Sequence, residues 1–217
     1  MDAAKRGADR QELHEHVRVH SMAASKVIKE EGGENDLLER IAGGFLVWCE
    51  KHLKKPAAGL KIAVGHDSRI SAGRISAALC RAFAPRGVQV LDCGLASTPS
   101  MFMATLELPC DCAVQITASH HPFFRNGLKF FTPAGGLDSP DISEILEYAE
   151  AGEAPAQAAG GAVTPTDYMT RYAANLREMI KAGVNAPDRD HPLEGFKIVV
   201  DAGNGAGGFY ATEVLEP

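Results

Sequence analysis

A serine, a histidine and a lysine lie close together in the segment ITASHHPFFRNGLKFF, residues 116–131. The hydroxyl of Ser119 is a weak nucleophile until a base or a positive charge assists it. The adjacent imidazole of His120 and the ammonium group of Lys129 can supply both kinds of assistance. These residue types at this spacing indicate an activated serine, or a serine that carries a phosphoryl group.

An ordinary structural interpretation competes with this one. Ser119 can end a strand, the two histidines can be exposed loop residues, and Lys129 can be a solvated strand residue. The site interpretation is favoured because the loop joins two predicted core strands, at the place where α/β proteins bind ligands. Asn126-Gly127 is the strongest turn signal of the chain, and we expect it to bring Lys129 back toward the serine.

Other kinds of site are less well supported. A serine hydrolase is disfavoured because the G-x-S-x-G sequence is absent around Ser119. A divalent metal site at His14, His16 and His20 is disfavoured because these histidines lie in a weakly structured tail, without a partner that would orient them.

The glycines Gly203, Gly205 and Gly208 match the dinucleotide pattern G-x-G-x-x-G. Such a site needs a strand before the loop, and a helix, a second strand and an acidic residue after it. A tight strand-to-helix turn that requires glycine is at least as good an interpretation of the same residues. Both interpretations stay open on the sequence alone.

Composition limits the classes of partner. The chain has 217 residues, of which 45% are hydrophobic and 23% charged, as expected of a globular protein with a substantial core. Its net charge is −6 and it has no long Lys/Arg run, so we expect no nucleic-acid partner. No apolar run reaches the ~18 residues of a membrane span, so we expect no membrane association. The five cysteines lack CxxC spacing and no secretory sequence opens the chain, which favours a cytoplasmic location.

Helix and strand patterns alternate around the candidate site. The predicted helices cover residues 35–55, 71–84, 97–108, 139–152 and 164–182, and the predicted strands cover residues 60–65, 88–94, 111–117, 128–131 and 196–200. We expect Asn35 and Ser139 to cap their helices and Gly183 to follow the last one. The apolar residues of these elements supply the core that positions the loop.

This alternation predicts an α/β fold. We expect a three-layer α/β/α domain with a mostly parallel mixed sheet, followed by the first elements of a second similar domain. The chain divides into a polar N-terminal segment (1–36), the first domain (37–154), and a linker with the start of a truncated second domain (155–217). The candidate loop would lie at the carboxyl end of a sheet strand.

Four segments, taken in order, resemble the α-D-phosphohexomutase family of phosphoglucomutases and phosphomannomutases. They are AVGHDSRISAG (63–73), DCGLASTPSMF (92–102), TASHHPFFRNGLKFF (117–131) and VVDAGNGAGG (199–208). The first three are similar to the family patterns V-G-x-D-x-R-x-S, D-x-G-x-x-x-T-P, and T-A-S-H-N-P followed by N-G-x-K. The fourth is similar to the start of the family's second domain. Order and spacing agree over roughly residues 37–217, which implies the family fold of four α/β domains around a cleft.

The resemblance implies a role for each residue of the loop. Ser119 would be a phosphoserine that exchanges its phosphoryl group with a sugar phosphate through a bisphosphate intermediate. Lys129 would be the general acid/base, and His120 would contact the transferring group. Asn126 and Gly127 would shape the loop. The implied cofactors are Mg²⁺, held by Ser119 through its phosphate, and a hexose 1,6-bisphosphate primer, and the implied partners are small-molecule sugar phosphates.

The chain also departs from the family pattern. His121 stands where the family commonly has Asn, the D-I-R-G segment has no counterpart before Asn35, and the D-G-D-G-D-R metal loop is absent. The sequence therefore predicts a partial phosphoglucomutase- or phosphomannomutase-type isomerase of carbohydrate metabolism, which interconverts hexose 1- and 6-phosphates in its complete form and is inactive as this fragment. The alternative is a non-catalytic phosphosugar-sensing or interaction module that retains the first domain.

Overall fold

The structure is a computed structural model that describes residues 36–122, 125–203 and 205–217. The helix cap expected at Asn35 and the three histidines of the N-terminal segment lie outside the described residues. Within the described ranges, no helix is both long enough and apolar enough to cross a membrane.

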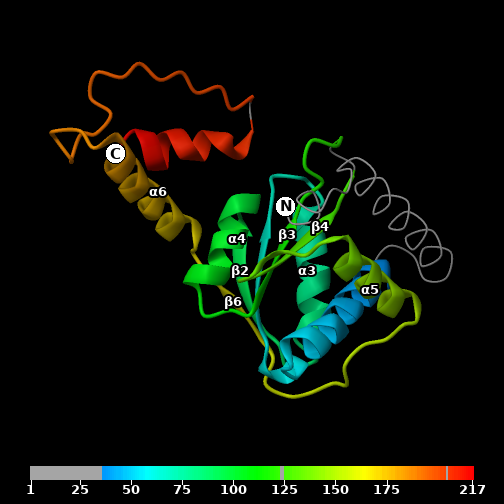
Figure 1. The fold of residues 1–217 in the computed structure, drawn as a ribbon. Coiled ribbons are helices and arrows are strands. Elements are labelled where there is room, and N and C mark those ends of the chain that lie inside the picture. Colours follow the sequence, from blue (N-terminus) through cyan, green and yellow to red (C-terminus); the bar gives the residue numbers. More distant parts are fainter. Residues whose placement is uncertain (1–35, 123–124, 204) are drawn as a thin grey trace.

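Helices and strands alternate along most of the described chain (Figure 1). Residues 36–53 are helical. They are followed by η1 (Ala57–Gly59), β1 (Lys61–His66), α3 (Ala72–Phe83), β2 (Gln89–Leu95), α4 (Thr98–Glu107), β3 (Cys112–Ile116), β4 (Leu128–Thr132), β5 (Gly135–Gly136), α5 (Ser139–Glu150), β6 (Ala162–Pro165), α6 (Met169–Val184), η2 (Ala206–Gly208) and η3 (Ala211–Leu215). The predicted α/β class is confirmed.

The strands form one mixed sheet in the order β5-β4-β3-β1-β2-β6. β3, β1, β2 and β6 run parallel to one another, while β4 and β5 are antiparallel to their neighbours. Val64 of β1 lies opposite both Asp92 of β2 and Val114 of β3. Parallel strands bring their carboxyl ends to the same edge, so the loops after β1, β2 and β3 meet there.

Alternate side chains of the sheet belong to two separate cores. Ile62 and Val64 of β1 pack with α3, α5 and the helix at residues 36–53, whereas Ala63 packs with α4 and Tyr168. Successive strand side chains point to opposite faces, so the division follows from the pleat. The helices accordingly lie on both sides of the sheet (Figure 1), as the predicted three-layer arrangement requires.

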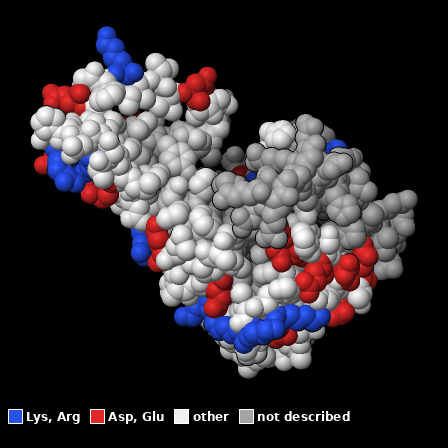
Figure 2. Space-filling model, viewed as in Figure 1, with Lys and Arg blue, Asp and Glu red and all other residues white. Residues whose placement is uncertain are grey.

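Acidic side chains gather over one helix on the face drawn in Figure 2. This helix is α5, whose sequence SPDISEILEYAE supplies four of them. The chain between Cys112 and Leu137, which includes the candidate loop, has no acidic residue. The local charge of the loop therefore differs from the negative charge of the chain as a whole.

Two helix ends differ from the prediction. Asp138, rather than Ser139, caps α5, because Asp138 and Asp141 each accept a hydrogen bond from the other's backbone N–H, at 3.4 and 3.1 Å. This reciprocal capping box needs an acceptor three residues before Asp141. α6 runs through Gly183, and Asn185 ends it with a φ of 51°, a left-handed conformation that asparagine tolerates.

A strand lies in the segment that composition predicts to be a linker. β6 pairs in parallel with β2, with Ala162 opposite Gln89 and Thr164 opposite Leu91. All four residues of β6 are exposed and it ends at Pro165, so it lacks the alternating pattern by which strands are recognised. Ala162 and Val163 were expected in the linker, while Thr164 and Pro165 were expected at the start of the helix that begins only at Met169. Both expectations are wrong here, whereas the division into domains at 37–154 and 155–217 stays a prediction.

The strand predicted at residues 196–200 is not formed. These residues have no strand structure and pair with no other strand among the described residues. Val199 is 95% exposed and Ile198 is 49% exposed, because a lone strand has no neighbour to satisfy its backbone and cover its side chains. Without that strand, the context of a dinucleotide loop is missing before Gly203. Its φ of 54° favours the tight-turn interpretation.

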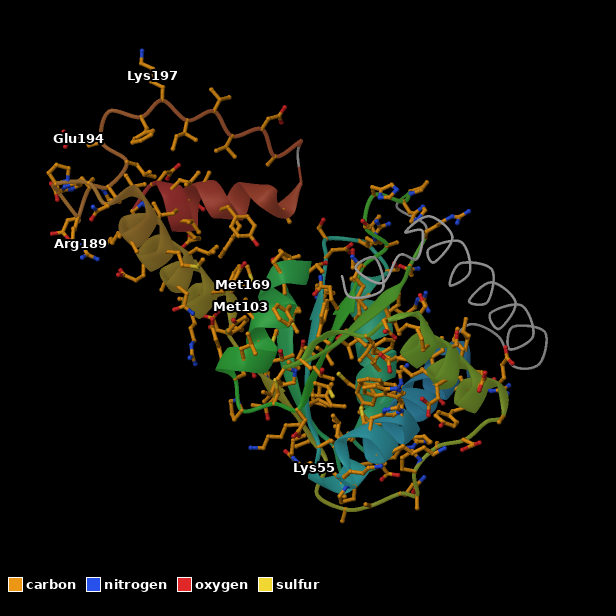
Figure 3. The ribbon with its side chains drawn as sticks, viewed as in Figure 1. Lys55, Met103, Met169, Arg189, Glu194 and Lys197 are labelled. Carbon is orange, nitrogen blue, oxygen red and sulfur yellow. The ribbon has the colours of Figure 1, made fainter. Side chains whose placement is uncertain are left out.

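α6 is attached to the sheet through α4. Met103 of α4 and Met169 at the start of α6 pack against the same core and lie close together in Figure 3. The hydroxyl of buried Tyr168 donates to Glu107 Oε2 at 2.9 Å, and Asn175 donates to the same oxygen at 2.7 Å. A charged acceptor with two donors holds the first half of α6 against α4.

Candidate functional site

The candidate loop begins where β3 reaches the carboxyl edge of the sheet. Residues 112–118 are buried, and the chain becomes exposed at Ser119. Ser119 has a φ of 55°, and its N–H donates to Thr117 Oγ1 at 3.0 Å. A serine rarely adopts this left-handed conformation and needs surrounding contacts to hold it. The loop thus presents Ser119 to solvent directly after a rigid buried strand.

The structure places His120 beside the serine. His120 Nδ1 lies 3.5 Å from Ser119 Oγ, at the outer limit of a hydrogen bond. The ring of His120 stacks on that of His121, with centroids 4.9 Å apart, and both histidines are exposed. The stacked imidazole can therefore contact a group carried on the serine oxygen without being tightly paired with the hydroxyl itself.

Lys129 lies on the strand next to the one that leads to Ser119. In the antiparallel pair of β3 and β4, Lys129 is opposite Gln115, so the two side chains share a face of the sheet. Gln115 is buried and donates to Ala96 O at 2.9 Å, whereas Lys129 is exposed. No hydrogen bond joins Lys129 to Ser119 in the part of the chain that the structure describes. The fold places Lys129 on the strand paired with β3, near the start of the loop, and leaves its side chain exposed.

Asn126 and Gly127 close the loop in different ways. Gly127 O accepts a hydrogen bond from Thr117 N at 2.9 Å, and a Cβ on Gly127 would lie 2.9 Å from Thr117 O. Glycine is therefore required for close approach of two backbone segments rather than for a positive φ. Asn126 Oδ1 accepts a hydrogen bond from the hydroxyl of Ser71, at the start of α3.

Arg69, which was not among the predicted site residues, makes four hydrogen bonds with the loop. Its Nη1 donates to the carbonyl oxygens of Pro122 and Arg125 at 2.7 and 3.0 Å. Its Nη2 donates to those of Ser119 and His121 at 2.9 and 3.0 Å. One guanidinium group therefore binds four backbone carbonyls of the loop.

The sequence held only an indirect signal for this role. Arg69 lies in AVGHDSRISAG, one of the segments that carry the family resemblance. Its acceptors are backbone carbonyls, which every residue has, so no residue type in the loop reveals that an arginine is needed. The pairing could be inferred only from the topology, since the loops after β1 and β3 meet at one edge of the sheet.

The described residues do not form a metal site by themselves. Among residues 36–122, 125–203 and 205–217, no group of three His, Cys, Asp or Glu side chains could hold a metal ion. Asp67, which follows β1 at the same edge as the loop, accepts hydrogen bonds from Arg69 N at 3.1 Å and Arg69 Nε at 3.0 Å. Its two oxygens are thus already bonded, so the fit of Mg²⁺ here depends on ligands beyond this set.

The geometry can be compared with known proteins. A sequence model described as phosphoglucomutase/phosphomannomutase, alpha/beta/alpha domain I, matches residues 23–156. The chain belongs to the phosphoglucomutase/phosphomannomutase family. The sequence resemblance is thereby confirmed, and the serine loop, β1 and α3 all lie within the matched residues of this family member.

Curated relatives of the chain are named phosphoglucosamine mutases. The protein of Corynebacterium jeikeium is 36% identical over 157 residues, which cover 69% of this chain and 33% of the relative. The protein of Corynebacterium glutamicum strain R is 35% identical over 184 residues, which cover 81% of this chain and 38% of the relative. That of Thermobifida fusca is 37% identical over 166 residues, covering 75% and 34%. The chain therefore spans about a third of the length of these relatives.

Solved structures support the fold. A phosphoglucomutase/phosphomannomutase family protein from Burkholderia thailandensis has a TM-score of 0.56 at 21% identity, over 68% of this chain and 32% of that one. A structure from Thermus thermophilus, named only provisionally as a phosphomannomutase, has a TM-score of 0.57 at 25% identity, over 71% and 34%. The first likeness concerns the fold alone.

Proposed function

We propose that the chain is the phosphoserine-bearing part of a phosphohexomutase that interconverts hexose 1-phosphate and 6-phosphate. The observation that carries the proposal is the placement of Ser119. Its side chain is exposed at the carboxyl edge of the sheet and lies beside His120, in a stretch without acidic residues. A loop of this charge is suited to a phosphoryl group. The names of the curated relatives make glucosamine phosphate the first substrate to test, with glucose and mannose phosphates as the other candidates.

In the proposed reaction Ser119 Oγ stores and exchanges a phosphoryl group. The bond between phosphorus and Oγ breaks as the free hydroxyl of the sugar monophosphate bonds to phosphorus, and the proton of that hydroxyl passes to the departing Oγ, with Lys129 as the general acid/base. The bisphosphate then returns its other phosphoryl group to Oγ, and the Oγ proton passes by the same route to the leaving sugar oxygen. His120 contacts the phosphoryl oxygens during both transfers. Positioning and charge neutralisation supply most of the catalysis in such transfers.

Mg²⁺ and a hexose 1,6-bisphosphate primer belong to the proposal. A bound Mg²⁺ neutralises charge on the phosphoryl oxygens. Ser119 would supply a ligand to the ion through its phosphate, and the described residues hold no group of three His, Cys, Asp or Glu side chains that could bind the ion by themselves.

A coupled assay of the full-length gene product tests the proposal. Formation of the 6-phosphate from the 1-phosphate is measured with Mg²⁺ and the bisphosphate, and mass spectrometry locates phosphate on Ser119. We expect Ser119→Ala to lose at least ~1,000-fold in kcat, because the phosphoryl acceptor is removed. Ser143→Ala, on α5, is the matched control and should keep full activity.

Two results would contradict the proposal: turnover by Ser119→Ala at the normal rate, or an active protein without phosphate on Ser119. Tight binding of sugar phosphates by the full-length product without turnover would instead favour a sensing module. For the 217-residue chain alone we expect negligible turnover, measured in the same assay at high protein concentration.

A further inference from the structure

The guanidinium group of Arg69 has no unused donor. Arginine has five N–H donors and no acceptor. The five are accounted for by Nε to Asp67 Oδ2, Nη1 to Pro122 O and Arg125 O, and Nη2 to Ser119 O and His121 O. The side chain is only 10% exposed. A phosphate could bind Arg69 only by displacing one of these acceptors.

The contacts of Arg69 join both limbs of the loop. Ser119, His121 and Pro122 precede residues 123–124, and Arg125 follows them. The carbonyl of Ser119 is itself one of the acceptors, at 2.9 Å. Ser119 also has a left-handed φ, so the hydrogen bond to its carbonyl helps to hold the backbone of the residue that bears the hydroxyl.

Arg69 is in turn fixed to the sheet by Asp67. The carboxylate of Asp67 accepts from Arg69 Nε and Arg69 N, and Asp67 N donates to Ile116 O, the last residue of β3, at 3.0 Å. Asp67 therefore links Arg69 to β3, the strand that leads into the loop. Ser71, two residues later, bonds Asn126 and supports the closing limb. The turn between β1 and α3 is therefore hydrogen-bonded to the residues on both sides of positions 123–124.

From this geometry we propose that Arg69 is a positioning residue, which holds the Ser119 loop in the conformation that phosphoryl transfer needs and does not itself bind phosphate. The importance of the loop for catalysis rests on the proposed function, but the holding of the loop does not. The role depends on the planar fork of five donors and not on charge alone. Lysine, with three donors on a flexible stem, cannot reproduce it.

Hydrogen exchange of the substrate-free 217-residue chain tests the holding role. In Arg69→Lys we expect the amides of Thr117 and His121, which are bonded inside the loop, to exchange at least ~10-fold faster. Peptides from α3 and α5 should be unchanged. Arg81→Lys, at the far end of α3, is the matched control and should leave the loop unchanged.

Two further variants separate a specific role from general instability. Asp67→Asn retains an acceptor for Arg69 but removes its charge, so it should speed loop exchange less than Arg69→Lys does. In Arg69→Ala, added guanidinium ion should slow loop exchange again, and an equal concentration of ammonium ion should not. If Arg69→Lys does not fold, the ordering and the rescue in these two variants decide the question.

The full-length protein supplies the functional readout. Arg69→Lys should lower kcat by ~100-fold and leave the KM for the sugar phosphate within about twofold. This is the result expected if Ser119 is misplaced while binding of the sugar phosphate is kept. Unchanged loop exchange in Arg69→Lys would overturn the proposal. So would a tenfold or larger rise in KM with unchanged kcat, which would make Arg69 a phosphate ligand. If the exchange result holds but Ser119 carries no phosphate, the proposed function fails and the holding role stands.

Discussion

The backbone of Ser119 gives a test that does not depend on activity. Its φ of 55° costs a residue with a side chain about 1–2 kcal/mol relative to an ordinary conformation, whereas glycine adopts it freely. We expect Ser119→Gly to be more stable than Ser119→Ala by about 1 kcal/mol, as measured by urea denaturation. The same pair at Ser143, inside α5, should show the reverse order, because alanine is favoured within helices. Equal stability of the two Ser119 variants would mean that the left-handed conformation is not held.

Buried thiols predict how stability depends on pH. Burial raises the pKa of Cys93 to about 12, and burial also raises that of Cys110 to about 11. In an unfolded chain these thiols ionise near their ordinary pKa of about 9, so the unfolded state loses protons first and stability falls as pH rises from about 9. Stability from this source is fully present at neutral pH.

Replacing Cys93 by serine removes one of these titrations. We expect the free energy of unfolding of Cys93→Ser to fall less steeply between pH 8 and pH 10, by about 1 kcal/mol at the upper end. Urea denaturation at each pH measures the free energy of unfolding. The change of this free energy with pH, and not its absolute value, is compared with that of the unaltered chain. Parallel pH curves for the two proteins would contradict the prediction.

Site residues with reactive side chains can be selected from the sequence, whereas a residue that binds only backbone groups of the site cannot. Ser119, His120 and Lys129 could be selected because hydroxyl, imidazole and ammonium groups rarely gather in one loop after a strand. Gly127 was selected with them, but as a turn former, whereas the structure shows a close approach to Thr117. Arg69 was missed because its acceptors are carbonyl groups.

At the scale of the elements, predictability follows burial. β1 and β3 are recognised because both are almost entirely buried and rich in apolar residues. β6 was missed because its place in the sheet is set by hydrogen bonds to β2 and not by a buried face. The start of α5 was misplaced by one residue because Asp138 and Ser139 are both good caps on composition, and the reciprocal bond with Asp141 decides between them.

The attachment of α6 to α4 can be tested through one hydroxyl. Tyr168→Phe removes a hydrogen bond to Glu107 while keeping the packing, and leaves a partly buried carboxylate with one donor fewer. We expect a loss of about 1–2 kcal/mol in the free energy of unfolding. Tyr172→Phe is the matched control, because the Tyr172 hydroxyl forms no hydrogen bond in the described structure. Its loss should stay within about 0.5 kcal/mol. Equal losses in the two variants would contradict the role given to Glu107.

At the scale of the whole molecule, two regions differ in how well their apolar side chains are buried. The sheet from β5 to β6 is covered by helices on both faces and contains both main cores. Residues 196–200 instead leave large apolar side chains exposed, namely Phe196, Ile198, Val199 and Val200. Lys197 in the same segment points outward, away from the rest of the molecule (Figure 3). The sequence has an apolar, β-forming composition there, but a strand also needs a partner strand, which the described residues do not provide.

An exposed segment of this kind should make the isolated 217-residue chain associate as its concentration rises. We expect the double variant Ile198→Lys with Val199→Lys to reduce association several-fold, because two charges oppose strand pairing and apolar contact. Light scattering across a concentration series measures the change in mean mass. Leu106→Lys is the matched control, since Leu106 is a 53% exposed apolar residue on α4, outside the segment. If this control lowers association as much as the double variant does, net charge rather than the unpaired segment governs it, and the prediction fails.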